Sequence, residues 1–350
     1  MSIELLNRLQ EAHAFDHAPL RRDLGVYHVP FYELIPGENP ETILAGVARR
    51  GERAAVVGQS GSGKSSLIEH VLGPLTSGIA PIAVPIFAEP YKVVTNVQAV
   101  AGLIIQTLAD RADLGDQERA EALEGASAKR TISRRRRITG LNMGGSWMGV
   151  GLQVEVKRQV PSSTELPRTA QATLEVLEQL LTAIQKDGYT PVLVFDDTDR
   201  WFRTVGGAIS HHGLALAFFG TVLPELRQLS TGMVVAAHNT YMESDAVVDQ
   251  LRATIELPIN IPTLSSSRAL GQVIHSRVIA NTCPGNPRTA PPLTEVIQTM
   301  AVDRLYQLYQ SDFQMSLRDV IRTVHVAVTE ACNGGYATVT PELVNQAAAW

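Results

Sequence analysis

The feature of this sequence that most constrains its fold is the eight-residue stretch Gly58-Gln-Ser-Gly-Ser-Gly-Lys-Ser65. It fits the pattern G-x-x-x-x-G-K-[ST], in which glycines let the backbone bend so that successive N–H groups point at phosphate oxygens. The apolar run Ala54–Gly58 predicts a buried parallel strand before it, and Ser65–Leu72 predicts a helix after it. A strand, such a loop and a helix in this order predict a nucleotide-binding α/β domain.

The residues of this loop have distinct expected roles. Lys64 is expected to reach the β- and γ-phosphates of ATP, and the Ser65 hydroxyl is expected to bind Mg²⁺. The loop as a whole is expected to hold the nucleotide phosphates through Gly58, Gln59, Ser60, Gly61, Ser62, Gly63, Lys64, Ser65 and Ser66.

A second candidate element is the apolar run Val192–Phe195, which ends in Asp196 and Asp197. Ligands of parallel α/β sheets bind at the carboxyl ends of the strands, where these two acids are expected to lie. Asp196 is expected to belong to the Mg²⁺ shell, and Asp197 to polarise the attacking water as a general base. An apolar strand that ends in acids is by itself often only a polar strand end, but the phosphate loop earlier in the chain favours the functional interpretation.

The pattern of elements predicts an α/β protein of two parts, a three-layer P-loop NTPase domain with a parallel sheet and a C-terminal all-helical lid. We expect an N-terminal segment at 1–40, the nucleotide-binding domain at 41–262 and the lid at 263–350. Within residues 1–40 a short helix is expected to precede loop and extended chain. Residues 113–166 are expected to form an insertion, in which the glycine-rich part 138–160 contains a hairpin.

Individual elements follow from hydrophobic periodicity. Pro81 and Pro85 place the second expected strand near a sheet edge or give it irregular ends. Strands are expected at 54–58, 79–87, 192–195, 233–237 and 255–261. Helices are expected at 40–50, 65–72, 97–112, 170–186, 214–229, 265–281, 292–310, 315–333 and 340–349.

Composition and charge exclude several classes of protein. A formal net charge of -5 excludes a uniformly basic nucleic-acid coat, although not a local basic patch. Two cysteines are too few for a disulfide scaffold and favour a reducing, cytoplasmic compartment. The charged N-terminus does not resemble a signal peptide, and no apolar run is long enough to span a membrane.

A basic cluster at residues 129–137 stands out against the acidic composition. Six of its nine residues are basic, and Lys157, Arg158 and Trp147 follow in the expected hairpin. Three interpretations remain open: charge-based binding of nucleic acid, pairing with the acids of 113–124, and docking of a protein partner. The candidate residues for nucleic acid are Arg134, Arg135, Arg136 and Arg137.

Taken together, the loop, the acidic strand and the elements after them resemble the AAA+ ATPases over about residues 41–350. The resemblance is to the initiator branch, the origin-recognition and cell-division-control ATPases, and to the related STAND signalling ATPases. It implies a first sensor at Asn239, on the strand between the two nucleotide motifs, and its neighbour His238 is the alternative candidate for this role. It also implies an arginine finger at Arg252, which reaches the nucleotide of a neighbouring subunit, and a second sensor at Arg318.

Two departures from this family pattern affect the expected function. The family usually has Asp-Glu at the acidic strand, and the shorter reach of Asp197 implies slow, switch-like ATP hydrolysis. Initiators continue past the lid into a winged-helix domain, whereas this sequence ends at Trp350, which makes origin binding a weaker expectation.

Three outputs are compatible with the resemblance. The first is an ATPase that forms a homo-oligomer on binding ATP and acts on or recruits a DNA-associated partner, such as a nuclease, transposase or helicase. The second is a STAND-type signalling or antiviral-defence ATPase that drives a separate effector protein without direct DNA contact. The third is a non-hydrolysing scaffold, which the intact Lys64 and Asp196 disfavour.

Overall fold

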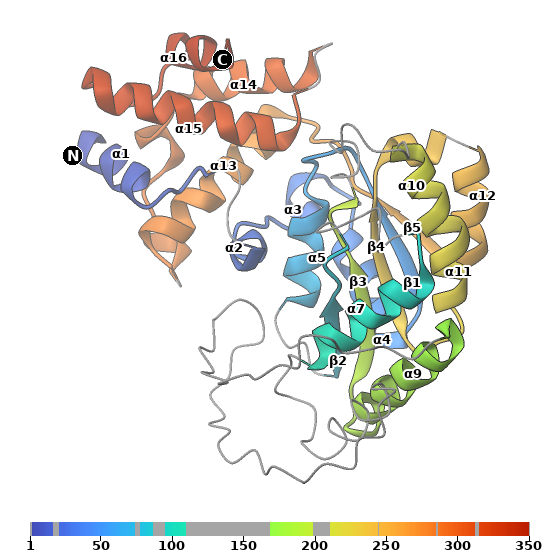
Figure 1. The fold of residues 1–350 in the computed structure, drawn as a ribbon. Helices are drawn as coiled ribbons and strands as arrows, with labels where there is room; N and C mark the ends of the chain where they lie inside the picture. Colours follow the sequence, from blue (N-terminus) through green and yellow to red (C-terminus); the bar gives the residue numbers. More distant parts are fainter. Residues whose placement is uncertain are drawn as a thin grey trace. The chain divides into compact units, whose positions relative to one another are not determined.

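The computed structural model of the chain forms two compact units (Figure 1). The first contains Met1–Ile43, Gly58–Val71 and Asn260–Trp350, and the second contains Leu44–Val57 and Leu72–Ile259. The insertion expected at 113–166, its hairpin and the arginines 134–137 lie outside the described residues. The structure describes residues 2–16, 21–73, 78–86, 95–109, 169–198, 211–243, 245–284, 286–311 and 315–349.

A five-stranded sheet in the order β2-β3-β4-β1-β5 forms the centre of the nucleotide-binding region. The pairs β2–β3, β3–β4 and β4–β1 are parallel, which confirms the predicted parallel sheet. β2, which contains Pro81, is an edge strand as expected. The strands are β1 (Arg53–Val57), β2 (Ile79–Ala83), β3 (Thr190–Phe195), β4 (Gly232–Ala237) and β5 (Leu257–Asn260).

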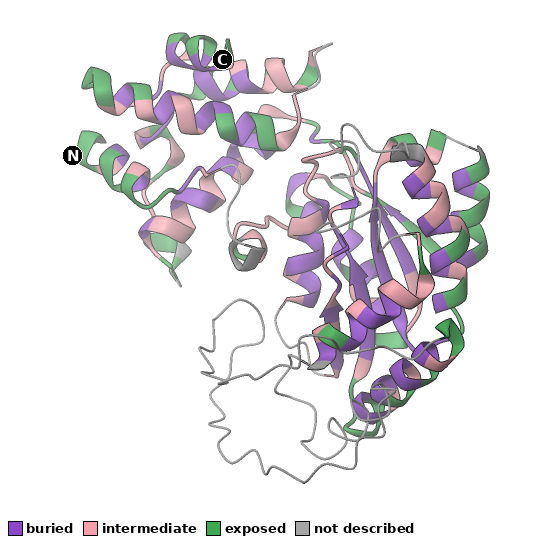
Figure 2. Ribbon diagram, in the orientation of Figure 1, coloured by how far each residue is buried: buried purple, intermediate pink, exposed green. Residues whose placement is uncertain are grey.

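Both faces of the sheet are largely buried along β2, β3, β4 and β1, as a three-layer fold requires, whereas three of the four residues of the edge strand β5 are exposed. Because side chains alternate along a strand, two sets of residues face opposite sides. One set joins the core of the second unit: Ala55, Val57, Ala80, Ile82, Leu193, Phe195, Met233, Val235 and Ala237. The other set is buried as well (Figure 2): Ala54, Val56, Val192, Val194, Val234 and Ala236.

Helices of the second unit pack around this sheet. α7 packs on α9 and β2, α9 packs on β3, and η2 packs on α10, α11 and α12. Four aromatic rings, Phe195, Phe218, Phe219 and Tyr241, meet edge to face with centroids 5.4–5.6 Å apart. The elements are α4 (Pro40–Arg50), α7 (Val97–Ala109), α9 (Ala170–Lys186), α10 (His211–Ala217), η2 (Phe218–Val222), α11 (Leu223–Leu226), η3 (Asn239–Glu243) and α12 (Asp245–Thr254).

Helices dominate the first unit, and its C-terminal part is helical as predicted. Leu6, Leu9 and Phe15 from the N-terminal segment are fully buried in one core with the C-terminal helices. Helix α1 contacts both α13 and α15. The helices are α1 (Ser2–Glu11), α2 (Arg21–Val26), α3 (Phe31–Leu34), α5 (Lys64–Leu72), α13 (Ser267–Thr282), α14 (Thr299–Gln310), α15 (Leu317–Gly334) and α16 (Pro341–Ala348).

Three local predictions were wrong. The helix expected at 292–310 begins only at Thr299, because Leu293–Glu295 forms a 3-10 turn and Ile297 pairs with Val339. The chain after residue 20 was expected to be loop and extended, but it forms the short helices α2 and α3, because Phe31 and Leu34 are buried by tertiary packing. The single helix expected at 214–229 contains a π-helical segment at Phe218–Val222 and ends at Leu226. That segment lets the neighbouring rings of Phe218 and Phe219 both reach the core.

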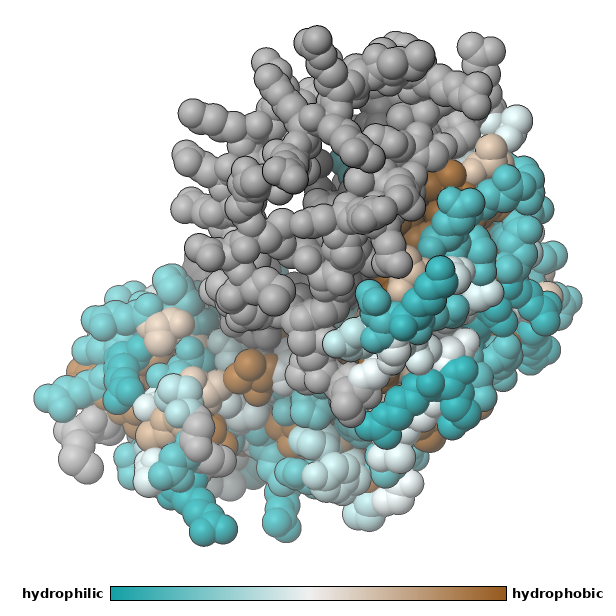
Figure 3. All heavy atoms as spheres, turned by 90° about the horizontal axis from the view of Figure 1, so that it is seen from below, coloured by the Kyte–Doolittle hydropathy of each residue, from teal (hydrophilic) through white to brown (hydrophobic). Residues whose placement is uncertain are grey.

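Hydrophilic residues cover most of the described surface on the face drawn in Figure 3. In the described part of the chain, every helix is too short or too polar to cross a bilayer.

Candidate nucleotide site

The phosphate loop joins the end of β1 at Val57 to the start of α5 at Lys64. Gly61 and Gly63 have φ angles of 74° and 104°, which residues with a Cβ rarely adopt. The Ser62 N–H donates to the Gln59 carbonyl at 3.2 Å, so the loop turns back on itself. The loop leads directly into the N-terminus of the nine-residue helix α5, where the helix dipole favours a bound anion.

Lys64 lies over this loop and is only 5% exposed. Its Nζ donates to the carbonyl oxygens of Gly58 at 2.8 Å and Gln59 at 2.7 Å. The ammonium group is thus held on the loop itself, at the head of α5. A fixed positive charge in this place is suited to the terminal phosphates of a nucleotide.

Helix α15 begins directly against the phosphate loop. A methyl group added to Gly61 would lie 2.7 Å from Ser316 Oγ and 2.8 Å from Arg318 Cβ. The Ser316 hydroxyl caps α15 by accepting from the Asp319 N–H at 3.2 Å, and Asp319 accepts in turn from the Ser316 N–H at 3.1 Å. This capping box fixes the first turn of α15, and with it the backbone of the exposed Arg318 beside the loop.

The two acids follow β3 as the sequence predicts. Asp196 is 5% exposed, and its Oδ1 accepts from the Asp197 N–H at 2.7 Å. Asp197 has a left-handed backbone with φ of 62°, a conformation that aspartate tolerates better than most residues. The hydroxyl of the next residue, Thr198, donates to the Ala236 carbonyl of β4. The main-chain carbonyl of Thr198 accepts from the Tyr241 hydroxyl at 3.3 Å. The turn that holds both carboxylates is therefore anchored to the adjacent strand.

The strand β4 lies between β3, which precedes the two acids, and β1, which precedes the phosphate loop. His238 and Asn239, the alternative first sensors, follow this strand and are both half-buried. His238 Nδ1 accepts from the Thr240 N–H at 3.1 Å, which orients its ring. Arg252, the predicted finger, is exposed on α12.

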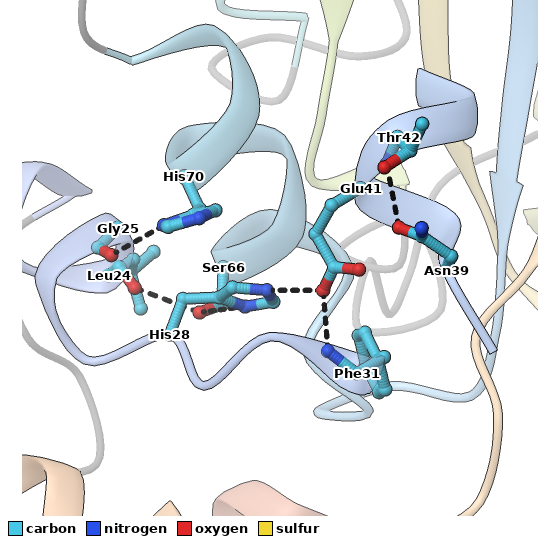
Figure 4. Close-up of polar contacts among 9 residues, drawn as sticks. All are labelled: Leu24, Gly25, His28, Phe31, Asn39, Glu41, Thr42, Ser66 and His70. Atoms are coloured by element: carbon cyan, nitrogen blue, oxygen red, sulfur yellow. Dashed lines mark hydrogen bonds and ion pairs between the residues drawn. The ribbon is translucent and has the colours of Figure 1, made fainter. Parts of the chain in front are cut away.

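A hydrogen-bond network on α5 was not predicted from the sequence (Figure 4). The Ser66 hydroxyl donates to the Leu24 carbonyl at 2.8 Å, and His28 Nδ1 lies 3.4 Å from it. His28 Nε2 and Glu41 Oε1 are 2.8 Å apart, and the same oxygen accepts from the Phe31 N–H at 2.7 Å. The hydroxyl of Ser66, a residue expected to help hold the nucleotide phosphates, is therefore engaged with Leu24.

The ionisation of this network follows from its surroundings. Burial favours a raised pKa for Glu41, but the hydrogen bonds from His28 and the Phe31 amide outweigh it and lower the pKa. The pKa of His70 is lowered by burial and then by the neighbouring charge of His28. Nothing in the sequence pattern marked these residues, because they come together only through tertiary packing.

Ser65 and Asp196, which the sequence predicts as Mg²⁺ ligands, both carry oxygen groups. Mg²⁺ prefers oxygen ligands and is usually bound by one or two protein groups together with waters and substrate phosphates. The Ser65 hydroxyl and the buried Asp196 carboxylate are each groups of this kind. The described residues contain no group of three or more His, Cys, Asp or Glu side chains placed to hold a metal ion without phosphate.

The parallel sheet, the phosphate loop and the acids after β3 together define a P-loop nucleotide-binding protein. A family model described as AAA ATPase domain matches residues 42–217, which is half of the chain. The chain therefore belongs to the AAA ATPase domain family.

Further comparisons place this chain beside solved structures. The structure of the Aeropyrum pernix ORC2 protein in ADPNP-ADP complexes is 14% identical, covers 93% of this chain and 71% of that chain, and gives a TM-score of 0.49. The ADP form of the same protein is 13% identical, covers 88% and 66%, and gives a TM-score of 0.48. A comparison with curated proteins finds no significant match.

Proposed function

We propose that this protein binds and hydrolyses ATP and uses the nucleotide state as a switch. The observation that carries this proposal is the contact between the phosphate loop and α15. Gly61 lies against Ser316 and Arg318, so a cation of the helical part is next to the loop that Lys64 covers. Such a pairing of loop and lid arginine gives the protein a means to distinguish ATP from ADP.

In this proposal each residue has one task. The loop amides and Lys64 bind the β- and γ-phosphates, and Ser65 and Asp196 hold Mg²⁺, which when bound neutralises phosphate charge. Asp197 orients the attacking water and takes up its proton as the γ-phosphoryl group leaves ADP. Asn239 or His238 aligns that water.

Assembly through ATP is the second part of the proposal. Arg252 is exposed on α12, and we assign it to the γ-phosphate of a neighbouring copy in a homo-oligomer. An arginine supplied in trans stabilises the charge of the transition state. Because the shorter Asp197 stands where a glutamate is usual, hydrolysis is expected to be slow, and ATP binding to control assembly.

The output that we favour is recruitment of a DNA-associated partner, with the arginines 134–137 on nucleic-acid phosphates. The acidic composition otherwise gives little attraction for DNA, so this cluster carries that part of the proposal. A STAND-type switch that drives a separate effector is the alternative, and the Asp196-Asp197 pair favours it. In either case a reducing, cytoplasmic setting suits a chain with only two cysteines.

Turnover by an Asp197→Asn variant tests the enzymatic part. The amide keeps the size and the left-handed tolerance of the side chain, but it cannot accept a proton. We expect ATP binding within about twofold of the wild type and a turnover loss of about 10²–10⁴. Asp187→Asn, an exposed cap of α9, is the matched control and should be unchanged. Hydrolysis by Asp197→Asn at the wild-type rate would remove the role of Asp197.

A further inference from the structure

Residues 24–28 contact the phosphate-binding helix α5 from Ser66 in its first turn to His70 in its last turn (Figure 4). The Leu24 carbonyl accepts from Ser66 at 2.8 Å, and the Gly25 carbonyl accepts from His70 Nδ1 at 3.3 Å. The rings of His28 and His70 lie 4.6 Å apart. Gly25 is so close to α5 that a methyl group on it would lie 3.2 Å from the Glu69 carbonyl carbon.

The same five residues hold helix α13 through Tyr27. The Ser276 hydroxyl donates to the Tyr27 carbonyl at 2.8 Å, and Asn281 Nδ2 donates to the Tyr27 hydroxyl at 3.4 Å. The guanidinium of Arg277 stacks over the Tyr27 ring, 4.6 Å from its centroid. Residues 24–28 thus contact α5 on one side and α13 on the other, and we name them the strap.

Arg277 extends this attachment to the N-terminal segment. It is 8% exposed and donates to the carbonyl oxygens of Asp16 at 2.7 Å and Ala14 at 3.3 Å. Burial lowers the pKa of Arg277 to about 10, so the side chain stays charged near neutral pH. The charge is therefore available to stack on Tyr27 under ordinary conditions.

The first unit therefore connects α5 to the C-terminal helices at two points. One is the contact of Gly61 with Ser316 and Arg318, just before α5 begins. The other is the strap, which reaches His70 in the last turn of α5. A nine-residue helix is about 13 Å long. Two contacts at opposite ends of such a helix prevent the C-terminal helices from pivoting about either contact alone.

We propose that the strap is a positioning element, in which Tyr27 and Gly25 keep Arg318 in register with the phosphate loop. A displacement of α13 on loss of the strap contact would reach Arg318 on α15, because α13, α14, α15 and α16 share one hydrophobic core. This inference rests on the proposed function, since Arg318 is assigned there to the γ-phosphate. Tyr27 and Gly25 do not touch the nucleotide in this account; they act through Arg318.

The ratio of ATP to ADP affinity is the quantity that reports this role. Arg318→Ala removes a charge-assisted contact to the γ-phosphate and should lower that ratio by about tenfold or more. Tyr27→Leu removes the ring under Arg277 and should lower the ATP/ADP affinity ratio at least fivefold. Tyr27→Phe keeps the ring and should therefore retain the wild-type ratio. In an Arg318→Ala background, Tyr27→Leu should change the ratio less than twofold, because its effect passes through Arg318.

A second variant approaches the strap from α5. Gly25→Ala improves intrinsic helix propensity in α2, so any loss of the ratio comes from contact with Glu69 and His70. Gly46→Ala in α4 is the matched control, since a methyl group there meets only the end of the Arg50 side chain. We expect Gly25→Ala to lower the ATP/ADP ratio and Gly46→Ala to leave it unchanged.

The outcomes separate the two proposals. If the wild-type protein binds no ATP, the proposed function fails and the strap has no role in it. If the wild type prefers ATP while both Tyr27→Leu and Gly25→Ala keep the full ratio, the strap inference alone is wrong. Equal effects of Tyr27→Leu with and without Arg318 also overturn it, because they show a general effect on folding; thermal unfolding of each variant accompanies the titrations.

Discussion

Gly61→Ala tests whether the start of α15 is held against the phosphate loop. The new Cβ has two costs. A residue with a side chain at φ of 74° loses about 1–2 kcal/mol in the left-handed region. The methyl group also lies 2.8 Å from Arg318 Cβ, and an ordinary contact of 3.4 Å requires a shift of about 0.6 Å. Such overpacking costs about 1–3 kcal/mol more.

Gly335→Ala provides the matched control at the other end of α15. Its φ is 69°, and a methyl group there meets nothing within 4 Å, so only the backbone cost of about 1–2 kcal/mol applies. Urea unfolding of both variants separates the two terms. Because displacement by a fraction of an ångström disturbs catalytic alignment, Gly61→Ala should also lose about tenfold or more in ATP turnover.

Equal destabilisation by Gly61→Ala and Gly335→Ala, together with wild-type turnover in both, would refute this reasoning. It would mean that α15 does not contact the loop in solution.

Three further predictions concern assembly, charge and pH. Arg252→Ala should bind ATP but hydrolyse it poorly, and mixing it with Asp197→Asn should recover activity, since a mixed interface pairs an intact arginine with an intact base; no recovery between folded oligomers would exclude the trans role. The lowered pKa keeps His70 neutral in the folded protein at pH values where it is protonated in the unfolded chain, so the free energy of unfolding should fall as the pH drops below 6.5. The fall should be smaller in His70→Gln, and urea unfolding at several pH values measures both. DNA binding should be independent of sequence, and its salt slope should flatten by up to roughly 3–4 per subunit on replacing with alanine Arg134, Arg135, Arg136 and Arg137.

The nucleotide-binding elements were predictable because their signals are local. The glycines of the loop 58–65 allow its backbone conformation without help from distant residues. Helix α5 begins within one residue of its expected start. The helices 40–50 and 170–186 have the expected bounds, because amphipathic periodicity extends to both ends. Pro81 correctly indicated an edge strand, since proline cannot donate to a second neighbour.

The parts that were not predictable depend on contacts distant in sequence. Helix α2 and the turn after it contain Gly25 and Pro30, which argue against helix locally; packing on α5 and α13 stabilises them. No sequence pattern predicts the left-handed backbone conformation of Asp197. The roles of Tyr27 and Arg277 likewise follow from a stacking contact across 250 residues of sequence, which no periodicity reveals.

Titration of the protein with ATP and Mg²⁺, compared with its Lys64→Ala variant, tests the central claim most directly. Lys64 is held on the loop carbonyls at 2.7–2.8 Å and supplies the charge nearest to the expected phosphates. Lys186→Ala, an exposed residue at the end of α9, is the control. The account predicts saturable ATP binding by the wild type and by Lys186→Ala, and none by Lys64→Ala. ATP binding of equal affinity in all three proteins would contradict it.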